Sequence, residues 1–467
     1  MSENFDYQDE LDPGSIVRRF EEMKKSGKEY FFDVDEFDVM IDYFLDNLML
    51  DQCQEAITMA MNQHPSGINF LLKQARLYIN ANQAEKALEL LTEIEKIEPS
   101  NADIFITKGS IYSQMKHYNK AIEEYNKAIN DSDDIDEIYT NIAFEYENMG
   151  NYEKAIEYLR KVLNLNPDNE SALYEISFCY EMTKKVSSGI DFLLDFIDKY
   201  PYSKAAWFNL GVLYNNFDYF EKAIEAYDYA IAIDENLAAA YFNKANAQAN
   251  LGLFTEAIET YKETLNLEDP EAITYYYIGE CFEKLEDYQQ AITYYHKALE
   301  EDYDLPDAWM GLGVACDELG KTQDALKYMK KAVELDEMNP EYWYMLAEIQ
   351  DKIELPEEAV QSYQHVLELD PANQDAWLDY SELTARIVNL EEAIRILDRF
   401  IVQHNPESPI LYRQAAYLFS LGLLKESYIK LEEALQTDPV KYPEMLDFLP
   451  EMNHDPVVAE LITKYKG

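Results

Sequence analysis

One phrase of the sequence recurs at a fixed spacing of 34 residues. It reads FEKAIEAYDYAIAIDEN from residue 220, YNKAIEEYNKAINDSDD from residue 118 and YEKAIEYLRKVLNLNPD from residue 152. A period of this length is typical of a helix–turn–helix unit, which buries its apolar face only by stacking on the next unit. The small residue of the phrase occurs twelve times without insertion, at Cys53, Ala87, Ala121, Ala155, Gly189, Ala223, Ala257, Ala291, Ala325, Ala359, Ala393 and Ser427. The repeat therefore predicts one long stack of paired helices.

Other columns of the repeat have a clear physical meaning once that small residue is numbered position 20. Position 8 is Gly, Ala or Ser in every unit except the first, which has Ile41, so two small columns allow the helices to approach closely. Positions 4, 8 and 11 share one helical face, as do positions 20, 24 and 27. Proline at position 32 ends the second helix in six units. Position 4 is always large: Phe37, Leu71, Phe105, Tyr139, Leu173, Trp207, Tyr241, Tyr275, Trp309, Trp343, Trp377 and Leu411.

These columns resemble the tetratricopeptide repeat (TPR) family, and the resemblance covers residues 34–441. It implies an all-α fold, a right-handed superhelical solenoid in which the first helices line a concave groove and the second helices lie outside. The sequence departs from the family pattern at position 27, where Phe196 and Phe400 replace a small residue. Units 9 to 11 also lack the aromatic residue at position 11.

The repeat register predicts three parts: an N-terminal extension (1–33), twelve tandem repeats (34–441) and C-terminal capping helices (442–467). We expect residues 1–12 to be disordered and residues 15–27 to form an amphipathic helix with Ser15 as N-cap and Gly27 as terminator. Gly189 opens a second helix, where glycine costs about 1 kcal/mol of helix stability, so flexing is predicted there. The alternative is that Phe196 fills the space and nothing bends.

The composition restricts the classes of partner and the location. The chain has 91 acidic and 39 basic residues, a net charge of −52, which repels nucleic acid and anionic lipid surfaces. It has no apolar run of about 18 residues, so we expect no membrane insertion. The start MSENFDYQDE resembles no targeting signal, which favours the cytoplasm. Four isolated cysteines are interpreted as buried thiols without disulfides.

No pattern in the sequence indicates catalysis. Nucleotide-binding, zinc-hydrolase and serine-hydrolase motifs do not occur, and the six histidines occupy unrelated repeat positions. The run DSDDIDE at residue 131 lacks the glycine of a calcium loop and is interpreted as a solvated turn. We therefore predict no catalytic residue, no metal site, no cofactor and no enzymatic activity.

The candidate partner-binding residues follow from the resemblance, which assigns positions 2, 5, 6, 9, 12 and 13 of each first helix to the groove. Position 5 is unusually apolar, either because it contacts a partner or because neighbouring helices crowd it. Asparagines in units 6 and 7 resemble the ladder with which the repeat domain of O-linked N-acetylglucosamine transferases holds extended peptides, because an amide both donates and accepts. An asparagine-rich solvent face is the alternative. The candidates are Asn141, Phe144, Tyr174, Phe178, Phe208, Asn209, Asn215, Phe242, Asn243, Asn246, Asn250 and Tyr276.

A second candidate surface lies on the first unit, where Asp35, Asp38, Asp42 and Asp46 share one helical face. Like charges at this spacing repel each other. Either the preceding basic helix folds back onto this face, or a basic partner binds there. The remaining alternative is that the lysines of that helix only complement their own helix end.

Together these observations predict a non-catalytic scaffold or adaptor that binds a protein or an extended peptide in its groove. The alternative is a regulatory subunit of a complex whose partner carries the catalytic activity. The lysine-rich carboxylate clamp of chaperone-binding TPR proteins is absent, because position 5 never holds lysine. The sequence indicates neither the partner nor the oligomeric state.

Overall fold

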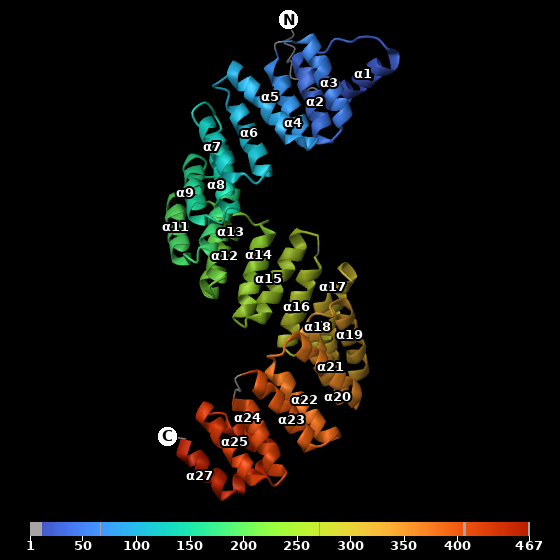
Figure 1. Cartoon of the computed structure of the whole chain (residues 1–467), viewed down its shortest axis with the longest axis vertical. Coiled ribbons are helices and arrows are strands. Elements are labelled where there is room, and N and C mark those ends of the chain that lie inside the picture. The colour runs from blue at the N-terminus through green and yellow to red at the C-terminus, as the bar shows by residue number, and fades with distance from the viewer. Residues whose placement is uncertain (1–11, 66, 270, 405–407, 466–467) are drawn as a thin grey trace. The chain divides into compact units, whose positions relative to one another are not determined.

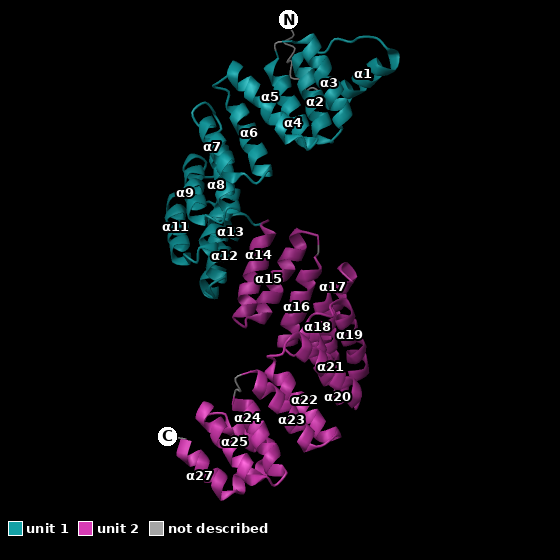
Figure 2. Cartoon of the chain, viewed as in Figure 1, with its two compact units in different colours: residues 1–235 teal, residues 236–467 magenta. Residues whose placement is uncertain are grey.

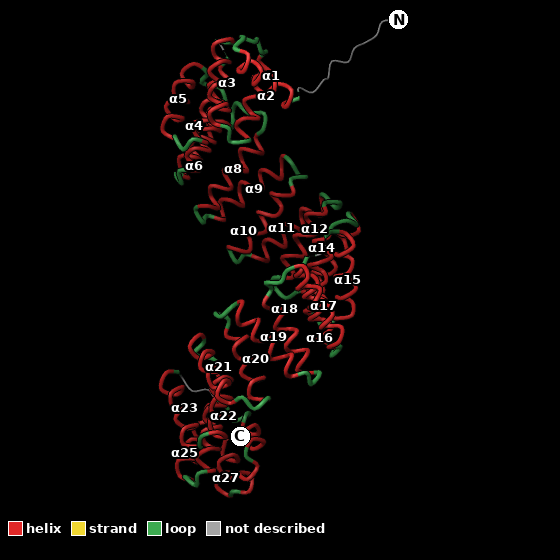
Figure 3. The backbone as a smooth tube through the Cα atoms, turned by 90° about the vertical axis from the view of Figure 1, so that its right-hand side faces the viewer, coloured by secondary structure: helices red, strands yellow, loops and turns green. Residues whose placement is uncertain are grey.

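The computed structural model describes residues 12–65, 67–269, 271–404 and 408–465, and every regular element within these ranges is a helix (Figures 1 and 3). The first helices of the pairs are α2 (Val34–Asp46), α4 (Ile68–Asn80), α6 (Ala102–Gln114), α8 (Ile135–Asn148), α10 (Glu170–Met182), α12 (Lys204–Asn215), α14 (Ala238–Asn250), α16 (Ala272–Lys284), α18 (Pro306–Glu318), α20 (Pro340–Lys352), α22 (Gln374–Ile387) and α24 (Ser408–Ser420). The second helices are α3 (Leu50–Gln63), α5 (Ala84–Ile97), α7 (Tyr118–Ala128), α9 (Tyr152–Leu165), α11 (Val186–Lys199), α13 (Phe220–Ile233), α15 (Phe254–Leu267), α17 (Tyr288–Glu301), α19 (Thr322–Leu335), α21 (Pro356–Leu369), α23 (Leu390–Gln403) and α25 (Leu424–Thr437). The all-α solenoid predicted from the 34-residue period is confirmed.

The chain reverses inside each helix pair at position 15. This residue adopts the left-handed conformation in both glycine and non-glycine forms, for example at Gly320 (φ 72°) and Leu48 (φ 55°). Val388 has φ −116° at the same position and departs from this pattern. Proline at position 32 ends the second helix as predicted: α9 stops at Leu165, two residues before Pro167.

The core of each pair depends on the match between positions 8 and 24. In unit 8 the Tyr295 ring lies directly against Gly279, where an added Cβ would come within 2.6 Å of Tyr295 Cε1. Unit 4 instead combines Ala143 with Leu159, and both side chains are buried. Gly279 therefore leaves room for the Tyr295 ring in this pair, whereas Ala245 and Ala347 occupy position 8 opposite the buried Tyr261 and Tyr363.

The tryptophans at position 4 join each first helix to the turn before it. The indole Nε1 of Trp309 donates to the carbonyl oxygen of Tyr303 at 2.9 Å, and that of Trp377 donates to Pro371 at 3.0 Å. Trp377 is buried, whereas Trp309 is half-buried. This column therefore combines packing with a hydrogen bond to a turn.

The chain divides into two compact units, Met1–Glu235 and Asn236–Gly467 (Figure 2). Unit 1 contains α1 to α13, and unit 2 contains α14 to α27. The four cysteines are buried free thiols, as predicted. Burial raises the pKa of the Cys53 thiol to about 12, so this sulfur stays protonated and unreactive at neutral pH.

The N-terminal helix α1 (Pro13–Ser26) packs on the first pair through one apolar face that includes Phe20 and Met23. Asp12, not Ser15, caps it, because the Asp12 carboxylate accepts from the backbone N–H groups of Gly14 and Ser15. The prediction of Ser15 as N-cap was therefore wrong by three residues. Gly27 ends the helix in the left-handed conformation, as predicted (φ 66°). The predicted disorder concerned residues 1–12, of which 1–11 lie outside the described residues.

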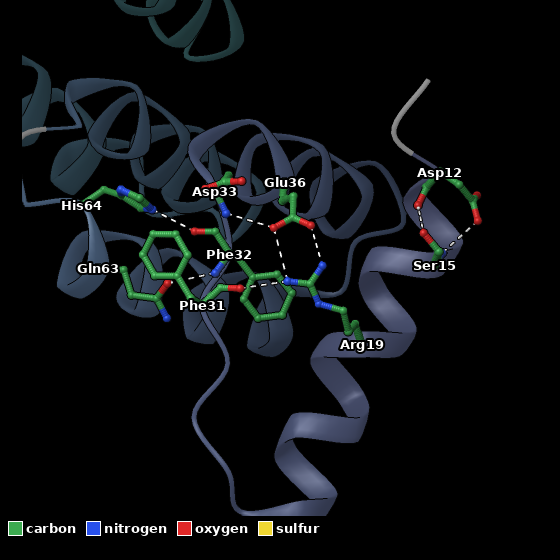
Figure 4. Close-up of polar contacts among 9 residues, drawn as sticks. All are labelled: Asp12, Ser15, Arg19, Phe31, Phe32, Asp33, Glu36, Gln63 and His64. Atoms are coloured by element: carbon green, nitrogen blue, oxygen red, sulfur yellow. Dashed lines mark hydrogen bonds and ion pairs between the residues drawn. The ribbon is translucent and has the colours of Figure 1, made fainter. Parts of the chain in front are cut away.

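Figure 4 shows how the connection between α1 and α2 is held. The Arg19 guanidinium donates to Glu36 at 2.5 Å and to the Phe31 carbonyl oxygen at 2.8 Å. On the other side, Gln63 Oε1 accepts from the Phe32 backbone N–H at 3.1 Å. Burial alone would raise the pKa of Glu36, but the hydrogen bonds from Arg19 and the Asp33 N–H keep it below its usual value.

The C-terminal segment consists of α26 (Tyr442–Phe448), a 3₁₀ helix (Pro450–His454) and α27 (Pro456–Tyr465). Met445, Met452 and Val458 are buried in one cluster with residues of α24 and α25. These helices lie where the sequence predicts a cap.

At the predicted soft point, α11 runs without interruption through Gly189. An added Cβ at Gly189 would lie 2.9 Å from Tyr180 Cβ, so the glycine permits a close approach between α10 and α11. Phe196 is buried. The atoms nearest to that added Cβ belong to Tyr180 and Leu213 and not to Phe196, so the expectation that Phe196 fills this space is not supported. Flexing at this helix stays a prediction.

Candidate partner-binding site

Three of the candidate residues are exposed on two successive first helices of unit 1, and we call these three residues the aromatic patch. Phe144 on α8 is 55% exposed, and Tyr174 and Phe178 on α10 are 59% and 38% exposed. Tyr174 and Phe178 are four residues apart and share one helix face. The Cys179 thiol donates to Glu147 Oε1 at 3.5 Å, so α8 and α10 are neighbours at this level, and Phe144 lies one turn before Glu147. The candidate Asn141, also on α8, is partly exposed.

Tyr174 is exposed because its own repeat offers no ring to cover it. Position 24 of that repeat is Leu193, which is fully buried. In the sixth repeat (α12 and α13) the equivalent residues are Phe208 and Tyr227, whose ring centroids lie 5.9 Å apart, and Phe208 is only half-exposed. Crowding therefore explains the aromatic residue at position 5 of the sixth repeat, whereas Tyr174 stays open to solvent.

Two carboxylates border the aromatic patch. Burial and the nearby negative charge of Glu175 raise the pKa of Glu147 to about 7, although the Cys179 hydrogen bond opposes the rise. Burial also raises the pKa of Glu175. A cation placed between these groups would relieve their repulsion, so this edge of the patch suits a basic group.

The asparagines of unit 1 are less available than the sequence suggested. Asn209 is 3% exposed, and its amide nitrogen donates to the Ala205 carbonyl oxygen of its own helix at 2.8 Å. The Asn215 Oδ1 is a buried atom without a hydrogen-bond partner among the described residues. Because Asn209 has little free surface, a bidentate contact with a peptide would require it to leave its helix carbonyl.

The candidates of unit 2 lie on α14 and α16. The ring of Phe242 is 5.7 Å from that of Tyr261, and the ring of Tyr276 is 5.8 Å from that of Tyr295. Asn246 accepts a short hydrogen bond from the Tyr261 hydroxyl. Asn250 is exposed at the helix end.

Asn243 differs from Asn246, because only its donor is occupied. Its amide nitrogen donates to Ala239 O at 2.9 Å, while its Oδ1 accepts from no described residue.

A cavity of about 370 Å³ opens beside Phe242 and Asn243, entirely within unit 2. The sequence alone did not reveal it, because its walls come from α14, α15, α16 and the turn before α16. One signal was present in the sequence: position 27 of the seventh repeat is Thr264, a polar residue in a column of mostly small residues. The lining residues are Ala238, Ala239, Phe242, Asn243, Thr264, Leu265, Glu268, Asp269, Glu271, Ile273, Thr274 and Tyr277.

The acidic face of the first repeat, on α2, forms ion pairs with α4 and not with the basic helix α1. Lys73 Nζ lies 3.2 Å from Asp38 Oδ1 and 2.7 Å from Asp42 Oδ2. Two of the four cations of α1 instead pair with other carboxylates, Arg19 with Glu36 and Lys24 with Glu55. The hypothesis that α1 folds onto the four aspartates was therefore wrong, although α1 does dock on the first pair. Asp35 lies in the first turn of α2, and Asp46 is exposed at its end.

The described residues contain no group of three or more His, Cys, Asp or Glu side chains able to hold a metal ion. No described helix is long and apolar enough to cross a membrane.

The stacked helix pairs and their small-residue columns define a helical-repeat solenoid. Comparison with family models identifies which one: models described as tetratricopeptide repeat match residues 102–130, 137–169, 205–237, 235–271, 284–349 and 340–373. The chain is a tetratricopeptide repeat protein. No curated protein matches it.

Solved structures with a similar fold include YrrB, a TPR protein with an unusual peptide-binding site, at 21% identity and a TM-score of 0.33 over 39% of this chain and 95% of that one. The C-terminal part of a TPR repeat-containing protein from Cytophaga hutchinsonii has 19% identity and a TM-score of 0.44, covering 52% and 99% of the two chains. The APC/C hetero-tetramer Cut9–Hcn1 has 14% identity and a TM-score of 0.41, covering 88% and 92%. At these identities the similarity concerns the fold alone.

Proposed function

We propose that this protein is a non-catalytic scaffold that binds a partner protein or extended peptide along its first helices. TPR repeats support a protein-interaction scaffold in general. The aromatic patch of Phe144, Tyr174 and Phe178 supports contact at this particular place. Binding by the other candidate residues, the absence of catalysis and the cytoplasmic location stay predictions.

The aromatic patch has the chemistry of a binding surface. Rings of Phe and Tyr supply large apolar contact areas, and interfaces are enriched in such residues. In four other repeats the position-5 ring lies against a tyrosine of the second helix: Phe208 against Tyr227, Phe242 against Tyr261, Tyr276 against Tyr295 and Tyr344 against Tyr363. Tyr174 lacks that cover, so a partner would bury surface that the fold leaves open.

The carboxylates beside the patch add a charge requirement to the partner. Glu147 and Glu175 repel each other, which a positively charged side chain of the partner would offset. Electrostatic complementarity of this kind favours basic partners and their rate of association.

The experiment is to isolate the partner with the full chain and then compare variants. Tyr174→Ala with Phe178→Ala removes two rings of the aromatic patch. We expect partner affinity to fall by about 2 kcal/mol or more, as for central aromatic contacts of an interface. Tyr202→Ala with Phe217→Ala is a matched control, because it removes one exposed tyrosine and one exposed phenylalanine outside the patch.

Circular dichroism must show unchanged helicity in both double variants. A partner that keeps its full affinity for Tyr174→Ala with Phe178→Ala would overturn the proposed site. Equal losses in the patch variant and the control would also contradict it, because a general loss of surface aromatics would then explain the result.

A further inference from the structure

We propose that the cavity of unit 2 between α14, α15 and α16 receives an arginine side chain of the partner peptide. This inference rests on the proposed function, because it assigns a recognition pocket to the same series of first helices. The volume of the cavity, about 370 Å³, lies at the small end of the roughly 300 to 1,000 Å³ that is usual for ligand pockets. That size suits one long side chain and its adjoining backbone better than a whole folded partner.

The walls of the cavity are apolar and aromatic. Phe242 and Tyr277 lie with their ring centroids 5.8 Å apart, and the Tyr277 ring stacks on that of Tyr261 at 6.0 Å. Leu265 and Ile273 complete this lining. Arginine matches such walls, because its aliphatic stem packs on apolar surface and its planar guanidinium favours aromatic faces.

Two uncharged polar groups of the lining still have hydrogen-bonding capacity. Thr264 is 9% exposed; its hydroxyl oxygen is buried and has no hydrogen-bond partner among the described residues, so a ligand reaches it only if the cavity wall adjusts. Asn243 offers Oδ1, since its amide nitrogen is occupied by Ala239 O. A buried hydroxyl without a partner destabilises the fold, which a bound donor would relieve. Guanidinium has five donors and no acceptor, so it complements these oxygens.

Three carboxylates give the cavity its charge preference. Glu268, Asp269 and Glu271 line it and are exposed. No Lys or Arg is among the lining residues, and no ion pair joins these three side chains to any cation of the described ranges. An apolar cavity bordered by unpaired negative charge selects a cation with an apolar stem. The same charges would repel an acidic or phosphorylated side chain.

The experiment selects twelve-residue peptides from a random displayed library against the purified full chain at about 150 mM salt, where long-range attraction is screened. We expect the selected peptides to share an arginine. In the synthetic peptide, citrulline in place of that arginine should weaken binding about tenfold or more, since it removes the charge and keeps the shape. A scrambled peptide of equal charge measures general attraction to this acidic chain.

Two variants locate the arginine. Ala239→Phe fills the cavity from an exposed position, and the triple variant Glu268→Gln, Asp269→Asn, Glu271→Gln removes its charge. Each should abolish the difference between the arginine and citrulline peptides. The charge-matched control is Glu354→Gln, Glu357→Gln, Glu358→Gln, three exposed carboxylates without ion pairs to described residues, and it should preserve the difference.

The outcomes separate this inference from the proposed function. If peptides bind without an arginine requirement, or if the citrulline effect persists in both cavity variants, the arginine site is overturned while peptide binding stands. If the library yields no binder, the proposal of peptide binding and the arginine site both fail. Loss of the citrulline effect in the cavity variants alone supports the assignment.

Discussion

The fit between Gly279 and Tyr295 makes the repeat core testable by one added methyl group. An alanine at Gly279 would place its Cβ 2.6 Å from Tyr295 Cε1 and 2.7 Å from Cδ1. The tyrosine ring cannot move away easily, because Gly311 lies against its other side, where an added Cβ would be 2.4 Å from Cζ. The Tyr295 hydroxyl also donates to Glu283 Oε2 at 2.8 Å.

Two opposing effects decide whether Gly279→Ala raises or lowers the free energy of unfolding. Alanine improves the propensity of a helix interior by about 1 kcal/mol relative to glycine. Overpacking costs about 1 to 3 kcal/mol. We therefore expect a net loss of up to about 2 kcal/mol in the native background. In a Tyr295→Leu background the methyl has room, as in the natural pair of Ala143 and Leu159, and the same change should stabilise the helix.

Hydrogen–deuterium exchange of peptides from α16 and α17 measures this effect locally, because repeats exchange with different opening free energies. Peptides from α24 and α25, several repeats away, serve as the internal control. The predicted result is that Gly279→Ala lowers the protection of α16 and α17 in the native background and raises it in the Tyr295→Leu background. An equal stabilisation by Gly279→Ala in both backgrounds would refute the steric reasoning.

Three further predictions concern stability. Trp377→Ala should destabilise α22 and α23 by about 3 to 5 kcal/mol, because the indole is 7% exposed, and the half-buried Trp309 should contribute less; hydrogen exchange would contradict this if both changes opened all repeats together. Phe20→Ala should destabilise α1 to α3 by about 3 to 5 kcal/mol, since this ring is fully buried against the first pair, and protection of α2 that survives unchanged would show that α1 adds nothing. The pKa of Glu147 is raised to about 7, above its unfolded value, so its contribution to stability is present below the unfolded pKa and is lost as pH rises through about 7. Glu147→Gln should therefore flatten the pH dependence of α8 and α10 exchange, corrected for intrinsic rates, and an unchanged slope would disprove the assignment.

The helices could be predicted from the sequence because the 34-residue period, the small columns and the prolines all indicate the same boundaries. The ends were harder, since several residues compete to cap a helix. Asp12 and Ser15 are both good N-caps, and Pro13 at the first helical position decides in favour of Asp12. The repeat columns do not include these residues, because Asp12 and Pro13 precede the first repeat.

The candidate site was only partly accessible to sequence reasoning. The exposure of Tyr174 depends on Leu193 at position 24, and that comparison between columns was available in the sequence. Burial of Asn209 and its bond to Ala205 depend on side-chain conformation, which residue spacing does not determine. The cavity beside Phe242 needs three helices and a turn in their final positions.

The central claim is that the first helices of unit 1 contact the partner. The most direct measurement replaces Tyr174 with the photocrosslinker p-benzoylphenylalanine and compares it with the same replacement of Tyr229 on the second helix α13. The two positions are 59% and 56% exposed, so accessibility is matched. The account predicts a crosslink to the partner from position 174 and none from position 229. A crosslink from position 229 alone would contradict it.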